Sequence, residues 1–271
     1  MRISERGQTA AKVPRLLCTA LLFLGMVANL NAAPIALTVM FDDYTEYFDS
    51  LVTPGTTFPP GWDVAFDSDS AYIMDNGSLT SDGIRSYGNL TQADRALGSL
   101  NDSSDPSALL IYGAEFLNST GSTINRLDIQ YTGEQWRRGN NTALDTLEFE
   151  YSTNATSVTD VAALWNPVTT LDFASPNTTG GASRINGNLF DNRGPRGELI
   201  SGLSIASGTG FWIRYIDRAL PGDDHGLSID NFQLTPLPAS ADIPEPPSGV
   251  LLAVGALAAG LFGLRQRRVR A

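Results

Sequence analysis

Between residues 34 and 236, hydrophobic and polar residues alternate along short segments that turn-forming residues separate. The segment "LDIQY" places Leu127, Ile129 and Tyr131 on one side of an extended chain, and "LEFEYS" repeats the pattern with Leu147 and Phe149. An alternation of period two is typical of a strand that is buried on one face. The middle of the chain therefore predicts a single all-β domain, an antiparallel β-sandwich or barrel.

Another segment, "GFWIRYID", has hydrophobic residues on both sides of the extended chain. Phe211, Ile213 and Tyr215 lie on one side, while Trp212 and Ile216 lie on the other side. This pattern predicts a strand that is covered on both faces, in which Arg214 needs a partner for its charge. Further strands are expected in "SALLIYG", "VTTLDF" and "ELISGLSI".

The alternation slips by one position near the end of the domain, in "GLSIDNFQL". Leu227 and Ile229 share one side, but the next hydrophobic residues, Phe232 and Leu234, are out of phase with them. A β-bulge around Asp230 and Asn231 restores the inward face after such a slip. The alternative is that these two polar residues cap the start of the last strand.

The first 33 residues have the pattern of a secretory signal peptide. Four basic residues precede or flank the apolar run "LLCTALLFLGMVANL", and small residues follow it up to Ala33. This order predicts export through the Sec translocation machinery and cleavage by signal peptidase after Ala32 or Ala33. An uncleaved membrane helix is the alternative, although the run is shorter than the roughly 20 residues that a spanning helix needs.

Composition narrows the function of the exported part. Residues 34–243 contain 27 Asp and Glu against 10 Arg and no Lys, a net charge of −17. Such a surface repels nucleic acid, so nucleic acid is excluded as a partner. The only cysteine is Cys18, within the signal peptide, so the mature chain has no disulfide bond and no cysteine chemistry.

The end of the chain has membrane-like composition. After a linker at 237–243, residues 247–264 carry no charge, which is about the length of a transmembrane helix. A basic tail at 265–271 follows and predicts a cytoplasmic C-terminus under the positive-inside rule. Its arginines are Arg265, Arg267, Arg268 and Arg270.

Pro244, Glu245 and Pro246 directly precede this apolar run. The order of Pro-Glu-Pro, apolar span and arginine cluster over 244–271 resembles the PEP-CTERM sorting signal of Gram-negative bacteria that make exopolysaccharide. The resemblance implies that an exosortase-type enzyme recognises the tail at the inner membrane, so that the protein reaches the cell surface or the extracellular matrix. A permanent membrane anchor is the alternative.

The middle of the chain carries a second resemblance. Its segments "FDDYTEYFDS", "TGEQWRRGN" and "DDHGLSIDNFQL" resemble those of a family of bacterial secreted jelly-roll domains. The resemblance implies that residues 34–236 form a single antiparallel jelly-roll β-sandwich. It implies little about chemistry.

A more distant resemblance, to lectin-like and adhesin-associated jelly rolls, implies a structural Ca²⁺ held by carboxylates near the first and last strands. Asp residues in the opening segment, in the loop before the last strand and in that strand supply oxygen ligands of the kind that Ca²⁺ prefers. Ordinary turn formation is the alternative for all of them. The candidate ligands are Asp42, Asp43, Asp223, Asp224 and Asp230.

The residues favour a protein that is not an enzyme. His225, the only histidine, is expected in an exposed loop, and no Gly-x-Ser-x-Gly elbow is present. Glu148 and Glu150 lie on one side of a predicted strand, as the carboxylates of a glycoside hydrolase do, but Thr153 stands where a third acid would complete the pattern. A glycan hydrolase therefore stays the alternative.

Tryptophans keep a carbohydrate-binding hypothesis open. In "GEQWRRGNN", Trp136 is a candidate platform for a sugar ring, with Arg137 and Glu134 as hydrogen-bonding neighbours. A core position for this tryptophan is the alternative. The sequence therefore predicts a non-enzymatic surface or matrix protein with a structural or carbohydrate-binding sandwich. A protein-binding adhesion module is a further alternative.

Overall fold

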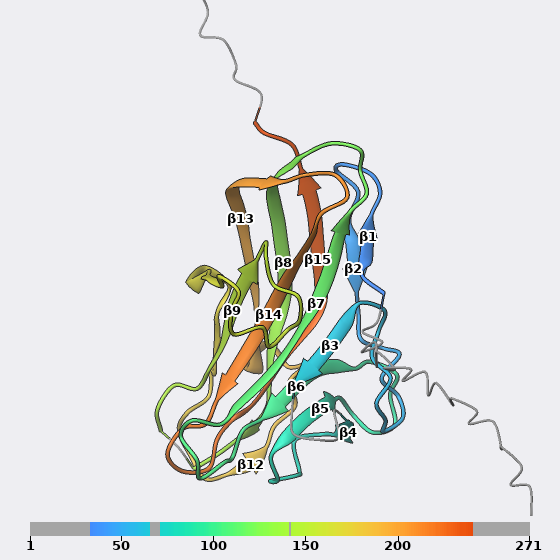
Figure 1. The fold of residues 1–271 in the computed structure, drawn as a ribbon. Helices are drawn as coiled ribbons and strands as arrows, with labels where there is room; N and C mark the ends of the chain where they lie inside the picture. Colours follow the sequence, from blue (N-terminus) through green and yellow to red (C-terminus); the bar gives the residue numbers. More distant parts are fainter. Residues whose placement is uncertain (1–32, 66–70, 141, 241–271) are drawn as a thin grey trace, which may run out of the picture. The chain divides into compact units, whose positions relative to one another are not determined.

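The computed structural model describes residues 33–65, 71–140 and 142–240 of the chain. Figure 1 shows their strands arranged in two layers. The predicted signal peptide, almost in full, and the sorting tail at 244–271 lie outside these residues. In the part of the chain that is described, no helix is long and apolar enough to cross a membrane.

One layer is a seven-stranded sheet in which β7 and β14 are central, with β1 and β3 on the other side of β7 and β9 beyond β14. Its pairs are antiparallel except β1 with β7, which is parallel. Its strands are β1 (Ile35–Leu37), β3 (Trp62–Ala65), β7 (Leu109–Asn118), β9 (Thr146–Ser152), β10 (Asn166–Pro167), β11 (Phe173–Ala174) and β14 (Gly210–Arg218).

The other layer is an eight-stranded sheet with β8 and β15 at its centre. The pair β4–β5 is parallel and the other pairs are antiparallel. Its strands are β2 (Tyr44–Glu46), β4 (Tyr72–Asp75), β5 (Gly83–Tyr87), β6 (Ala96–Leu100), β8 (Ile124–Arg138), β12 (Ser183–Arg184), β13 (Arg193–Ile205) and β15 (Gly226–Leu237). The two sheets form the predicted jelly-roll β-sandwich.

The core between the sheets contains the residues that the alternation assigned to it. Leu127, Ile129 and Tyr131 of β8 are buried, as are Phe211 and Tyr215 of β14. The rings of Tyr131 and Tyr215 meet edge to face across the sandwich, with centroids 5.3 Å apart. Such aromatic pairs add to the hydrophobic stabilisation that burial provides.

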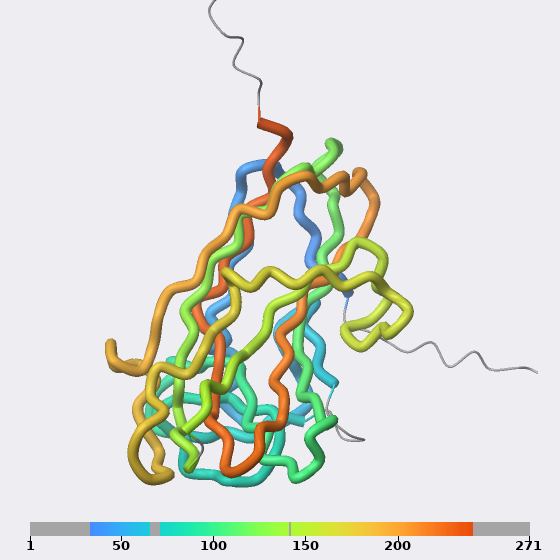
Figure 2. The backbone as a smooth tube through the Cα atoms, turned by 90° about the vertical axis from the view of Figure 1, so that its left-hand side faces the viewer, coloured from blue at the N-terminus to red at the C-terminus, as the bar shows by residue number. Residues whose placement is uncertain are grey.

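The expectation that β14 is covered on both faces is confirmed. Trp212 and Ile216 are buried on its outer side, where Val158 packs against them. The segment that follows β9 supplies Val158, and it lies against the outside of the seven-stranded sheet (Figure 2). A second, smaller hydrophobic cluster therefore forms outside the sandwich.

Arg214 finds the partner that its buried strand requires. Its guanidinium lies 2.6 Å from the Glu150 carboxylate, and it stacks over the Trp165 ring at 3.7 Å from the centroid. The charge is thus balanced by an ion pair and by a cation–π contact. Glu150 is a structural partner in this arrangement.

The predicted strand in "VTTLDF" is wrong for most of its length. Residues Thr169–Leu171 form a short 3₁₀ helix (η1), and only β11 is extended. The Asp172 carboxylate accepts a hydrogen bond of 2.8 Å from the N–H of Phe149 in β9. A side chain here takes the place of a backbone ladder bond, which the alternation of residues does not reveal.

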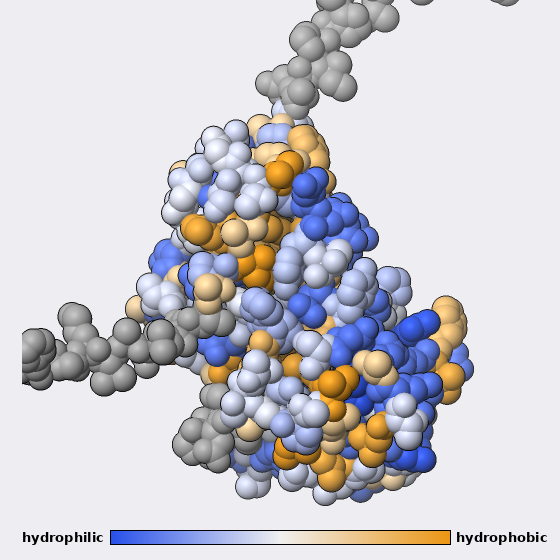
Figure 3. Space-filling model, turned by 90° about the vertical axis from the view of Figure 1, so that its right-hand side faces the viewer, coloured by the Kyte–Doolittle hydropathy of each residue, from blue (hydrophilic) through white to orange (hydrophobic). Residues whose placement is uncertain are grey.

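The surface follows the acidic, polar composition. On the face drawn in Figure 3, hydrophobic residues are gathered in separate patches among hydrophilic ones. The described chain leaves the sandwich after β15, at the upper end in Figure 1. A second short 3₁₀ helix, η2 (Phe190–Asn192), lies between β12 and β13, and its neighbours contribute to the site described next.

Candidate functional site

Three neighbouring strands bring polar side chains to the outer face of the eight-stranded sheet. In β8, Tyr131 points into the core, so Thr132 and Glu134 point outward. Glu134 is paired directly with Arg193 of β13, and Thr132 is paired with Asp230 of β15. Because directly paired residues lie on the same face of a sheet, Arg193, Glu134 and Asp230 share this outer face.

An open cavity of about 650 Å³ lies on this face, and we call it the polar hollow. Its walls come from the loop between β5 and β6, the segment between β12 and β13, and the middle of β15. The lining residues are Gln92, Ala93, Asp94, Asn186, Asn188, Arg193, Asp230 and Asn231. Seven of these eight side chains can form hydrogen bonds through polar or charged groups.

A β-bulge builds one wall of the polar hollow. The register of β15 against β8 shifts between Asp230 and Gln233, and Asn231 has the left-handed φ of 51°. The backbone N–H and the side-chain amide of Asn231 each donate to the Asp230 carboxylate at 2.7 Å. The predicted bulge is thus confirmed, and its effect is to bring both side chains into the hollow.

Glu134 lies on the same face of the sheet as the lining residues Arg193 and Asp230, with only 1% of its surface exposed. Its Oε2 accepts a 2.8 Å hydrogen bond from the Trp136 indole, whereas Oε1 has no partner among the described residues. Burial raises the pKa of Glu134 to about 7, with a smaller rise from Asp94; the indole bond and Arg193 act in the opposite direction. Glu134 is therefore a much weaker acid than an exposed glutamate.

Asp230 has a similarly perturbed acidity. Burial raises its pKa to about 8, the charge of Glu134 adds to the rise, and the Asn231 N–H lowers it. Asp94 and Asp49 contribute smaller increases. Two acidic groups on neighbouring strands thus titrate near neutrality, which is more common at functional sites than elsewhere in proteins.

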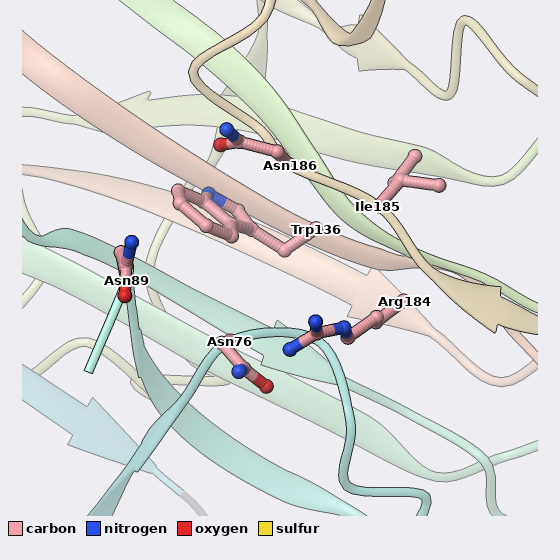
Figure 4. Close-up of a pocket in the computed structure, with 6 residues that line it drawn as sticks. All are labelled: Asn76, Asn89, Trp136, Arg184, Ile185 and Asn186. Carbon is pink, nitrogen blue, oxygen red and sulfur yellow. The ribbon is translucent and has the colours of Figure 1, made fainter. Parts of the chain in front are cut away.

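A smaller cavity of about 260 Å³ adjoins the hollow and shares Asn186 with it. Figure 4 shows the Trp136 ring between Asn89 and Asn186, with Arg184 reaching toward Asn76. The complete lining is Asn76, Asn89, Trp136, Arg184, Ile185 and Asn186. Both cavities belong to one continuous stretch of the outer face.

Of the two hypotheses for Trp136, a sugar-binding platform or a core position, the structure supports the core position. The side chain is 2% exposed and stacks on Tyr87 with ring centroids 6.1 Å apart. The segment after β12 covers it so closely that a Cβ on Gly187 would lie 2.3 Å from the indole nitrogen. Trp136 is therefore a buried wall that holds Glu134. Trp62 and Trp212 are buried as well.

Two exposed aromatic residues lie close to lining residues in the chain or in the sheet register, and the sequence pattern did not single out either one. Phe190 is 87% exposed and lies in the chain between the lining residues Asn188 and Arg193. Tyr47 is 53% exposed and follows β2, whose Glu46 is paired with the residue next to Asn231. Apolar residues inside the turn-forming run "GNLFDNRG" were the available signal for Phe190.

Of the other predicted glycan-binding residues, Arg137 stands apart. Its guanidinium donates to the carbonyl oxygen of Gly77 at 3.2 Å, and it lines neither cavity. The structure thus brings Glu134 and Trp136 together on the outer face and gives Arg137 a bond to the loop after β4.

The five candidate calcium ligands lie in three places. Asp43, beside Asp42, accepts a hydrogen bond from Thr235 near the end of β15, and Asp230 lies in the middle of that strand. Asp223 and Asp224 lie before its start, where Asp223 accepts from Asn140 and Asp224 from the N–H of Leu220. Within the described ranges, no group of three or more His, Cys, Asp or Glu residues is placed to hold a metal ion.

The expectation of an exposed histidine is wrong. His225 is fully buried, and its Nδ1 accepts a 2.9 Å hydrogen bond from the N–H of Gly139. Burial lowers the pKa of the imidazole. Glu148 and Glu150, the other candidate catalytic residues, instead form ion pairs with Arg218 and Arg214 on the outer side of the seven-stranded sheet.

A second acidic cluster lies between the sheets. Asp217 of β14 is fully buried and accepts a 2.6 Å hydrogen bond from Ser99 of the opposite sheet, while its Oδ1 has no partner in the described part of the chain. Burial raises the pKa of Asp217 to about 7 and that of Asp145 well above its usual range. Asp224 raises both further. Neither Asp217 nor Asp145 lines the two cavities described above.

No protein-family model matches the chain, and no curated protein matches it. Among solved structures, the CBM22-1 xylan-binding domain from Paenibacillus barcinonensis Xyn10C is 12% identical, with a TM-score of 0.39 over 75% of this chain and 99% of that domain. The K3 cleaved adhesin domain of Lys-gingipain from Porphyromonas gingivalis is 13% identical, with a TM-score of 0.41 over 71% and 98%.

A third structure, TmCBM61 in complex with beta-1,4-galactotriose, is 12% identical, with a TM-score of 0.32 over 65% of this chain and 88% of that one. Likenesses of this size carry no argument about function. What the site does must be inferred from its own residues.

Proposed function

We propose that this chain is an exported, non-enzymatic protein whose β-sandwich binds carbohydrate in the polar hollow. The observation that carries the proposal is a hollow lined by amide and carboxylate groups, together with exposed aromatic residues that neighbour lining residues in the chain or the sheet register. Amides such as Asn188 and Asn231 both donate and accept hydrogen bonds, as sugar hydroxyls require. Phe190 and Tyr47 offer apolar faces on which a sugar ring can stack.

The wide, shallow form of the site also favours a chain-like polar ligand. The polar hollow adjoins the smaller Trp136 cavity through Asn186, so neighbouring sugar units can occupy neighbouring positions. A mostly polar lining differs from the apolar pockets that take drug-like molecules or cofactors. A polysaccharide is therefore the partner that we propose.

Binding to a glycan array tests the proposal. Purified full-length protein in detergent is compared with the Phe190→Ala variant, which removes the exposed ring beside the hollow. The control is Phe41→Ala, since Phe41 is also an exposed ring, 64% accessible, but lies by β15 residue Pro236. Loss of glycan binding in the first variant alone supports the proposal, whereas a protein that binds no glycan, or equal binding by both variants, contradicts it.

Glycan hydrolysis is the second candidate, because Glu134 lies on the same face of the sheet as Asp230, which lines the hollow. They lie diagonally across two paired strands, a relation that separates Cβ atoms by about 7 to 8 Å at most. Inverting glycosidases hold their carboxyl groups roughly 6.5 to 9.5 Å apart. Release of reducing sugar by the wild type, and its loss in Asp230→Asn, would favour this function over simple binding.

A protein-binding adhesion module is the third candidate, and the same hollow would hold a polar loop of the partner. The glycan array separates the two ideas, because an adhesion module of this kind gives no glycan signal. If the wild type retains proteins from a bacterial surface extract and binds no glycan on the array, adhesion is favoured.

For the tail, we propose sorting by an exosortase-type enzyme after export through the Sec machinery. Pro244, Glu245 and Pro246, the apolar run 247–264 and the terminal arginines support this proposal from the sequence. The sandwich ends with β15 at Leu237, so only a short linker separates it from the sorting motif. Mass spectrometry of the protein from its host tests the idea, since an intact Ala271 contradicts processing.

A further inference from the structure

The charge of the polar hollow is one-sided, which bears on the kind of glycan it can take. Asp94 and Asp230 line it, and Glu134 lies on the same face of the sheet. Asp49 is near enough to raise the pKa of Asp230, whereas Arg193 is the one basic residue in the lining. Among the described residues, Arg193 forms no ion pair with these carboxylates within 4.0 Å. Arg193 and Arg95 act electrostatically on Glu134 and Asp94, but acids outnumber basic residues around the hollow.

Building on the proposed function, we propose that the hollow binds a glycan that carries protonated amino groups, such as an oligomer of glucosamine. Burying a carboxylate is costly unless a charge or hydrogen-bond donor compensates it. Glu134 has its Oε1 unpartnered while 99% of its surface is buried, and it faces the same side of the sheet as the lining residues Arg193 and Asp230. An ammonium group supplies both the charge and the donors.

The bonds already present agree with this assignment. Asp230 receives both of its hydrogen bonds from its chain neighbour Asn231, and Asp94 receives one of 2.5 Å from Asn188. These neutral amide donors hold the carboxylates at the hollow without neutralising them. A glycan with carboxylate groups is disfavoured, because its charge repels Asp94 and opposes ionisation of Asp230 and Glu134.

Amine binding at this site also moves protons. The groups that face Asp230 are Glu134 from β8, Asp94 from the loop before β6, Asp49 from the loop after β2 and Arg193 from β13. A protonated amine favours the ionised form of the carboxyls, so their protons pass to the solvent when the ligand binds. A neutral glycan gives no such driving force.

The test compares glucosamine hexamer with N-acetylglucosamine hexamer by isothermal titration calorimetry at pH 7. Full-length protein is used, in buffers of different ionisation enthalpy so that released protons are counted. We expect the glucosamine hexamer to bind at least about tenfold more tightly than the acetylated hexamer, a gain in affinity typical of a charge-assisted hydrogen bond. We also expect net release of protons when the glucosamine hexamer binds.

Variants locate the effect. Asp230→Asn and Glu134→Gln are each expected to remove most of the preference for the amine form and to reduce proton release. Asp128→Asn is the matched control, because Asp128 lies on the same strand and face as Glu134 but is paired with Leu199 and Thr235, neither of which lines the hollow. Asp94→Asn, at an exposed position, provides the third test if a buried variant folds poorly.

The outcomes separate this inference from the proposed function. Equal or tighter binding of the acetylated hexamer overturns the amine preference and leaves carbohydrate binding in place. Binding of neither hexamer, together with a silent glycan array, overturns both. An amine preference that persists in Asp230→Asn and Glu134→Gln places the ligand elsewhere and also overturns the inference.

Discussion

Two acidic clusters in this protein are buried to a similar degree but differ in what they face. Glu134 and Asp230 lie on the outer side of the eight-stranded sheet beside an open cavity of about 650 Å³. Asp217 and Asp145 are buried in the interior, where the bond of Asp217 with Ser99 joins the two sheets. A cationic ligand could balance the negative charge of Glu134 and Asp230. The negative charge of Asp217 and Asp145 is instead reduced by bound protons.

The comparison shows that a raised carboxyl pKa occurs in this fold both beside a surface cavity and in the closed interior. Burial is the leading cause in both clusters, and neighbouring acids add to it. What distinguishes them is access, because a cationic ligand can reach Asp230 from the hollow while the bond of Asp217 points across the interior. A third group, Glu148 and Glu150, is paired with arginines and serves as the reference for acids that are already neutralised.

The largest expected effect concerns the stability of the wild type as a function of pH. Asp217 has a pKa of about 7 in the fold against 3.8 for the ordinary group. The folded state therefore binds this proton more tightly, so its contribution is complete below about pH 4 and is lost as the pH rises through about 7. Urea unfolding should show a decrease on the order of a few kcal/mol between pH 5 and pH 8.

The variant Asp217→Asn checks the source of that decrease. The amide keeps an oxygen that can accept the Ser99 hydrogen bond and has no proton to lose, so the slope between pH 5 and pH 8 should become shallower. A wild-type protein that gains stability over this interval, or an unchanged slope in the variant, would show that the interior cluster is ionised and compensated in the fold.

A smaller loss of stability, confined to the region of Trp136 and Glu134, is expected from Gly187→Ala. The new Cβ would lie 2.3 Å from the Trp136 indole, so the covering segment must move at a typical overpacking cost of about 1 to 3 kcal/mol. Gly181→Ala is the matched control, since nothing lies within 4 Å of the added atom. Urea midpoints measure the cost, and ligand binding should fall only in Gly187→Ala. Equal midpoints would mean that the cover over Trp136 is loose.

The two clusters should also separate in binding. Glu134→Gln removes an acid near the hollow. It is expected to lower the affinity for an amine-bearing glycan about tenfold, which corresponds to about 1.4 kcal/mol of binding free energy. Asp217→Asn alters the interior and should leave the dissociation constant unchanged at a pH where both variants are folded. Calorimetric titration of both measures this, and a similar loss in both would show that the clusters act as one unit.

The smallest effect is expected where an acid is already paired at the surface. Glu148→Gln removes the ion pair between Glu148, which is 37% exposed, and Arg218, which is 48% exposed. Exposed pairs contribute roughly 0 to 1 kcal/mol, so the urea midpoint should move little. A loss as large as that from Gly187→Ala would contradict the use of this pair as a neutralised reference.

Much of the fold could be predicted from the order of residues, because strand faces follow from local alternation. The buried sides of β8 and β14, the covered outer side of Trp212 and the bulge at Asp230 were all readable in this way. The strand expected at "VTTLDF" failed because Asp172 bonds to the backbone of β9, a contact between segments distant in sequence. His225 was placed in the wrong environment because its bond to Gly139 joins segments 86 residues apart.

The candidate site was only partly predictable. Glu134 and Trp136 were chosen correctly as neighbours, but their burial depends on the segment after β12, which pairs with the end of β8. The lining residues Asp94, Asn188 and Arg193 lie in different parts of the sequence and have no local pattern in common. Their meeting follows from strand register, which one sequence does not specify.

The sequence by itself determined that the chain alternates into strands, carries a strongly acidic middle and slips its register at Asp230 and Asn231, since each of these depends on residues close together in the chain. Only the tertiary structure decided which acids meet a cavity and which meet the interior. The physical reason is that burial and access are properties of packed surfaces, and the pairing of β8 with β13 and β15 creates both.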